Sequence, residues 1–154
     1  MRIVRFTIKL LLHPHRRNFF VLLLLLTMAG CSPDSGQATQ RWYSQQQVDD
    51  GAEIFQPYCA SCHGEKAQSK AGWKKADEQG HYPAPPLDGT AHAWHHDLSV
   101  LRPTIDIGGL PLGGTMPGFK GQLSDVERDS VIAYFQSFWS DDIYGKWAER
   151  FLKE

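Results

Sequence analysis

The pentapeptide Cys59-Ala60-Ser61-Cys62-His63 constrains the fold of this 154-residue chain more than any other feature. Its pattern, C-x-x-C-H, is the attachment signature of c-type haem. Two thiols three residues apart lie on the same face of a helical turn, so both can add to the vinyl groups of one porphyrin. The histidine that follows directly is placed to become the proximal ligand of the iron. The motif predicts one haem c, attached through Cys59 and Cys62 and ligated by His63.

A C-x-x-C pair alone has two other interpretations, a thioredoxin-like redox pair and half of a zinc site. The chain has three cysteines, and no second C-x-x-C completes a zinc site. A histidine directly after the pair, in a chain with an export signal, favours haem. A colourless zinc-binding or thiol-redox protein stays open as an alternative.

The first thirty residues have the three parts of a secretory signal peptide. Basic residues come first, the apolar run 19–26 follows, and small residues lead up to Cys31. The run is well short of the roughly 18 apolar residues that span a membrane. Met28-Ala29-Gly30-Cys31 resembles a bacterial lipobox, which implies that Cys31 becomes the lipid-modified N-terminus. We expect residues 1–30 to be removed and the domain to be lipid-anchored on the periplasmic face of a bacterial membrane.

The charge of the chain changes with that cleavage. The full sequence carries −1, and loss of the five basic residues and no acidic residue in 1–30 leaves −6. A nucleic-acid partner would favour a basic domain, so we expect none. Residues 31–46 are rich in Ser, Gln, Thr and Gly, which predicts a flexible tether.

Hydrophobic periodicity predicts an all-α domain over 47–140, with no alternating stretch that would indicate a strand. The Ser-x-x-Glu capping box at Ser124 marks the start of its clearest helix. The sequence predicts helices over 47–56, over 91–107, from 125 to about 139, and, in the amphipathic extension 141–154, over 143–151.

Two segments are predicted to be loops. Residues 83–89 contain three prolines, which remove backbone donors and fix φ. Residues 108–118 are interrupted repeatedly by Gly and Pro, and they carry Met116.

The sixth ligand of the iron separates an electron carrier from an enzyme. Met116 is the only methionine left after cleavage of 1–30, and a Gly/Pro loop is a poor place for a core residue. A thioether favours ferrous iron and raises the reduction potential relative to two histidines. Met116 is therefore the predicted ligand, and the competing candidates are His81, His92, His95 and His96.

With these motifs in order, residues 47–140 resemble the class I monohaem cytochrome c family. Gly51 and Phe55 match the family's N-terminal helix, and Met116-Pro117-Gly118-Phe119 matches the bacterial M-P-x-F ligand loop. On the last helix the partner positions are Val131, Tyr134 and Phe135. The resemblance implies an all-α fold of helices packed around one covalent haem.

Pro85 and Leu87 match the family's P-x-L loop. The resemblance implies that the Pro85 carbonyl accepts a hydrogen bond from the His63 ring, which would fix the tautomer and orientation of that ligand. Pro85 and Leu87 are therefore expected to contribute to the haem site.

The leading functional hypothesis is a single-electron carrier with His/Met ligation, which needs no catalytic residues. It would exchange electrons with donor and acceptor redox proteins. It would do so either as an independent carrier or as the cytochrome subunit of a redox complex. The alternative is a peroxidase-like haem enzyme or a gas sensor with an open sixth position.

Overall fold

The computed structural model describes residues 40–153. The predicted signal peptide, Cys31 and the first part of the predicted tether lie outside the described residues. In the described part, no helix is both long and apolar enough to cross a membrane. The helices are α2 (Gln45–Tyr58), α3 (Ala60–His63), α4 (Leu98–Ile107), α5 (Asp125–Ser137) and α6 (Asp141–Phe151), with 3-10 turns η2 (His92–His95) and η3 (Leu110–Leu112).

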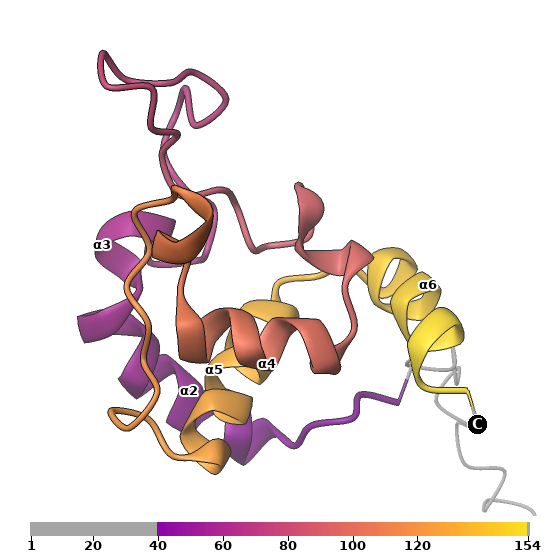
Figure 1. The fold of residues 1–154 in the computed structure, drawn as a ribbon. Coiled ribbons are helices and arrows are strands. Elements are labelled where there is room, and N and C mark those ends of the chain that lie inside the picture. The colour runs from indigo at the N-terminus through magenta and orange to yellow at the C-terminus, as the bar shows by residue number, and fades with distance from the viewer. Residues whose placement is uncertain (1–39, 154) are drawn as a thin grey trace, which may run out of the picture. The chain divides into compact units, whose positions relative to one another are not determined.

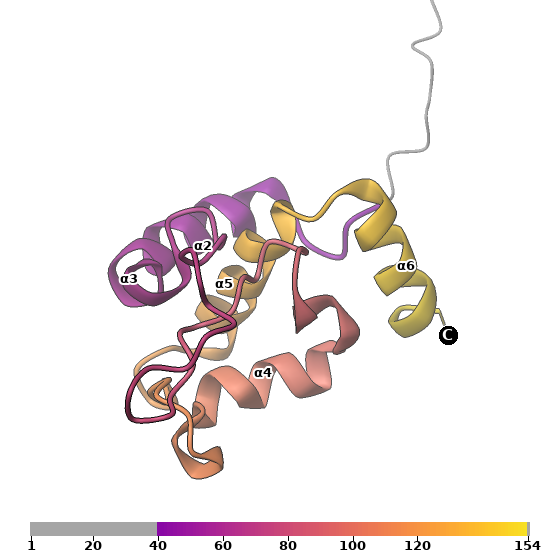
Figure 2. The same ribbon diagram turned by 90° about the horizontal axis from the view of Figure 1, so that it is seen from above.

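No strand occurs between residues 40 and 153, where the only β pairing is an isolated bridge between Lys120 and Leu123. The prediction of an all-α domain is confirmed. Figures 1 and 2 show α2 crossing α5, and Figure 1 shows the long segment after α3 projecting away from the helices.

The closest helix packing in the domain is the crossing of α2 over α5. A Cβ atom on Gly51 would lie 1.9 Å from the Ser130 carbonyl oxygen, so only glycine permits this approach. One turn later Phe55 is fully buried, and its ring centroid lies 5.0 Å from that of Tyr134. The crossing fixes the end of α2, which carries the C-x-x-C-H motif.

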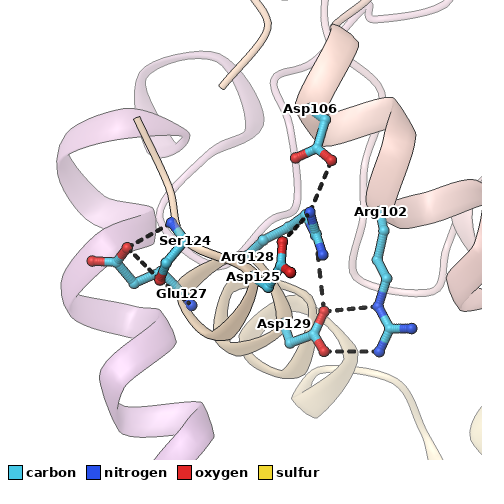
Figure 3. A network of polar contacts seen from close by, with 7 residues as sticks. All are labelled: Arg102, Asp106, Ser124, Asp125, Glu127, Arg128 and Asp129. Carbon is cyan, nitrogen blue, oxygen red and sulfur yellow. Dashed lines mark hydrogen bonds and ion pairs between the residues drawn. The ribbon is translucent and has the colours of Figure 1, made fainter. Parts of the chain in front are cut away.

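The start of α5 agrees with its predicted capping box. The Ser124 hydroxyl accepts from the Glu127 amide, and the Ser124 amide donates to the Glu127 carboxylate at 2.8 Å. Both contacts appear in Figure 3. Val131 and Phe135, which the sequence places on this helix, are both buried.

Two arginine–carboxylate pairs join α4 to α5. Arg102 binds Asp129 with two hydrogen bonds of 2.8 Å, and Arg128 reaches back to Asp106 at 2.8 Å. Figure 3 shows these side chains bridging the two helices. The Arg102–Asp129 pair is bidentate, and such a pair holds geometry more strictly than a single contact. The single Arg128–Asp106 bond adds a second point of attachment near the C-terminal end of α4.

The predicted helix over 91–107 is wrong at its start. Residues 92–95 form a 3-10 turn, and α4 begins only at Leu98. The reason is Asp97, whose side chain accepts from the Val100 amide at 3.1 Å and caps a new helix. Leu101 and Ile105 are the buried residues of α4.

The predicted tether is too long at its C-terminal end. Helix α2 begins at Gln45, and the residues before it already pack on the domain. The Trp42 amide donates to the Tyr144 hydroxyl at 2.7 Å, and its indole donates to the Gln136 side chain at 2.6 Å. Arg41 pairs with Asp141 at 2.8 Å. Because the sequence around Trp42 is polar and has no apolar periodicity, it gave no indication of these tertiary contacts.

The C-terminal extension folds as the predicted helix, α6, and packs on its own domain. Tyr144 and Trp147 are fully buried, and the Trp147 indole donates to the His96 carbonyl at 2.7 Å. This bond ties α6 to the residue after η2.

We predict that Gly51→Ala destabilises the holoprotein by about 3 kcal/mol or more, because the added methyl overlaps the backbone of α5. Chemical denaturation followed by circular dichroism measures the change. Gly145→Ala is the matched control, since nothing lies within 4 Å of a Cβ there. In the middle of α6 it should stabilise by about 0.5–1 kcal/mol. Equal stabilities of the two variants would refute the close crossing.

Candidate functional site

The C-x-x-C-H motif forms a tight turn where α2 passes into α3. The Cys59 amide donates to the Phe55 carbonyl at 2.8 Å, and the His63 amide donates to the Cys59 carbonyl at 2.9 Å. Both cysteines are free thiols, Cys59 half-buried and Cys62 exposed. Cys59, Cys62 and His63 line one cleft together.

His63 is oriented by a backbone carbonyl. Its Nδ1 lies 2.9 Å from the Pro85 oxygen, which can only accept, so Nδ1 carries the proton. Burial lowers the pKa of His63, outweighing the opposite effect of the Pro85 bond. The side chain is therefore a neutral imidazole with its Nε2 lone pair free, the form in which histidine ligates iron.

Cys59 does not have the properties of the reactive thiol of a thioredoxin-like pair. Burial, with a smaller contribution from Cys62, raises the pKa of the Cys59 thiol to about 11. A thiol of the redox type needs a lowered pKa instead. Within residues 40–153, no group of three or more His, Cys, Asp or Glu side chains is arranged to hold a metal ion. The structure favours neither the thiol-redox nor the zinc alternative.

The loop that carries Met116 is pressed against the C-terminal end of α4. The Gly109 amide donates to the Met116 carbonyl at 3.0 Å, and the Phe119 amide donates to the Ile105 carbonyl at 3.0 Å. Gly108 has φ +75°, and a Cβ there would lie 2.5 Å from the Met116 oxygen. A residue with a side chain could not occupy that position without moving the loop.

Met116 lines the same cleft as His63, although 53 residues separate them in the chain. The cleft has a volume of about 350 Å³, within the roughly 300–1,000 Å³ typical of ligand pockets. Most of its walls are apolar or aromatic. None of His81, His92, His95 and His96 is among the described residues that line it.

The two residues of the predicted P-x-L loop have different positions. Pro85 lines the cleft and accepts the His63 bond. Leu87 is not among the cleft-lining residues, and it packs against the hydrophobic core instead. Its amide donates to the Ala67 carbonyl at 2.7 Å.

Among the cleft-lining residues that sequence reasoning missed are three large side chains, Tyr58, Lys70 and Tyr82. Tyr58 directly precedes Cys59, so its place could have been inferred from the motif. Lys70 and Tyr82 belong to the polar segment 64–82, which has no periodicity from which to predict a position. Their location depends on how the chain folds back over the cleft.

The arrangement fits a covalently held haem. Two free thiols on one turn, a neutral imidazole and a thioether all face one largely apolar cleft. Sulfur and imidazole are the donors that c-type haem uses in proteins. Such a group supplies reversible one-electron exchange, and the chain supplies its position and surroundings.

Comparisons with known proteins agree with this chemistry. The family described as "Cytochrome C oxidase, cbb3-type, subunit III" matches residues 46–135, more than half of the chain. The chain is also similar to the cytochrome c subunit of the alcohol dehydrogenase (quinone) of Gluconobacter oxydans (strain 621H), with 29% identity over 119 residues.

That alignment covers 73% of this chain and 23% of the relative, so the chain spans about a quarter of the relative's length. No solved structure matches the chain. The C-x-x-C-H turn, the cleft and the family match lead to one conclusion: the chain belongs to the cytochrome c domain family of cbb3-type oxidase subunit III, electron-transfer domains that hold haem c.

Proposed function

We propose that this chain is a single-electron carrier whose haem iron is held between His63 and Met116. The observation that carries the proposal is the shared cleft, which His63 and Met116 line from different segments while the other described histidines do not. His63 offers a lone pair and Met116 a soft thioether. Together they would fill both axial positions and set a comparatively high reduction potential.

The residues around the cleft have distinct tasks in this proposal. Cys59 and Cys62 hold the haem covalently, and the Pro85 carbonyl keeps His63 in the ligating tautomer. Apolar walls such as Phe119 exclude water from the iron. No acid, base or nucleophile is required, so the chain would act as a carrier and not as an enzyme.

The proposed setting is the periplasmic face of a bacterial membrane, with the domain anchored through a lipid on Cys31. The supporting observations are the signal-like residues 1–30 and the lipobox-like Met28-Ala29-Gly30-Cys31. Multiple acyl chains at about 0.8 kcal/mol per buried methylene give firm anchoring.

Redox proteins are the proposed partners. The Gluconobacter relative is named as the cytochrome c subunit of a quinone alcohol dehydrogenase. By analogy, this chain would pass electrons as a subunit or close associate of a dehydrogenase or oxidase complex.

The axial ligands can be tested with carbon monoxide. The reduced wild-type protein should not bind it, because both axial positions are filled, whereas reduced Met116→Ala should bind it and show a lower potential. Leu110→Ala is the control, since Leu110 is 63% exposed on the same loop and should leave both properties unchanged. Rapid binding by the wild type would instead reveal an open sixth position, as a haem enzyme or gas sensor requires.

The covalent attachment can be tested at the motif itself. Cys59→Ala and Cys62→Ala, expressed in a periplasm with haem-attachment machinery, should lose most of their covalent haem because a thioether link is missing. Haem staining after denaturing electrophoresis and the pyridine haemochrome spectrum measure this. Ala60→Ser, which leaves both thiols intact, should keep a full complement. Full haem content in both cysteine variants would disprove the attachment.

The anchor can be tested by exchanging the N-terminal segment. Replacing residues 1–31 with a signal peptide cleaved before Ser32 should move the haem protein into the soluble periplasmic fraction. The native sequence is the control, and its N-terminal peptide should begin at an acylated Cys31 by mass spectrometry. A version without Cys31 that stayed in the membrane would show that another anchor exists.

A further inference from the structure

The carbonyl that orients His63 belongs to a segment held on both sides. On one side, the Ser69 hydroxyl donates to the Ala84 carbonyl. On the other, the Leu87 amide donates to the Ala67 carbonyl at 2.7 Å, and the Trp139 indole donates to the Leu87 carbonyl at 2.7 Å. The Pro85 carbonyl lies between these anchors.

The chemistry of this segment makes it stiff. Pro86, between Pro85 and Leu87, is buried and has its φ fixed by its ring. A residue that precedes proline is itself restricted, which limits the backbone of Pro85. Between the Leu87 carbonyl and the Pro85 carbonyl, the fixed φ of Pro86 and the restricted backbone of Pro85 therefore leave few dihedral angles that could absorb a displacement of Leu87.

Trp139 is itself rigidly placed. It is 2% exposed, and its ring meets that of Trp147 edge to face at 5.9 Å. Arg41 donates to its carbonyl at 3.2 Å. Trp139 lies just after the end of α5 at Ser137 and beyond the family match at residues 46–135.

We propose that Trp139 is a positioning residue for the haem: its indole N–H fixes the Leu87 carbonyl and thereby holds the Pro85 carbonyl on His63 Nδ1. The inference rests on the proposed ligation of haem iron by His63. A firm Nδ1–H to carbonyl bond increases the basicity of the imidazole as a ligand. A more basic ligand stabilises ferric iron, so Trp139 lowers the reduction potential.

The test compares two tryptophan-to-phenylalanine variants of the holoprotein. Trp139→Phe and Trp147→Phe each remove a buried indole N–H that donates to a backbone carbonyl at 2.7 Å. Both belong to the same aromatic cluster, so both should lose similar stability. The carbonyl bound by Trp147 is that of His96, which has no bond to the segment 84–87.

Trp139→Phe should shift the reduction potential upward, whereas Trp147→Phe should leave it at the wild-type value. In the reduced protein, nuclear magnetic resonance should show faster solvent exchange of the His63 ring N–H in Trp139→Phe only. Equal potentials and equal exchange rates in the two variants would overturn the inference, because stability loss alone would then explain both.

Two further measurements keep the outcome decisive. If Trp139→Phe does not fold, a benzothienyl alanine at position 139 preserves the ring shape and removes only the N–H, and the same upward shift is expected. A pyridine haemochrome spectrum typical of haem c in every variant would show that each variant still carries covalently attached haem. Loss of covalent haem from the wild type would refute the proposed function, whereas an unshifted potential with haem bound refutes only the role of Trp139.

Discussion

The crossing of α2 over α5 is the constraint on which the other parts of the site depend. Gly51 brings the two backbones together, and the end of α2 is fixed as a result. The C-x-x-C-H turn continues directly from that end, so the direction of both thiols and of His63 follows from one helix contact. The ion pairs between α4 and α5 extend the same frame to the Met116 loop. A single packed pair of helices thus positions His63 and Met116, which come from two distant parts of the chain.

Local chemistry explains why much of the site could be predicted from the sequence. The thiols and His63 lie within five residues, the capping box of α5 lies within four, and Met116 is the only methionine left after the predicted cleavage. Features that depend on tertiary contacts were not predictable in this way. Trp42 and Tyr43 lie in a polar stretch and pack on α6, about a hundred residues away. The helix expected over 91–107 begins only at Leu98, because the Asp97 side chain caps it there.

Leu87 shows the same limit within the site itself. Its place in the P-x-L loop predicts a part in the haem site, but it does not indicate that the side chain packs against the core or that the carbonyl has a distant partner. The partner of its carbonyl, Trp139, is 52 residues away in the sequence. No motif spans that distance, so this link could be seen only once the fold was known.

The packing of Arg41 and Trp42 against α6 has a consequence for how far the domain can move. With Cys31 as the proposed anchor, only residues 32–40 separate the lipid from the folded domain. Nine residues span at most about 30 Å even when fully extended. The domain would then search a thin layer above the membrane, where its effective concentration toward a membrane-bound partner is far above that of a freely diffusing carrier. A short tether of this kind would favour repeated electron transfer to the same neighbouring protein over electron transport across the periplasm.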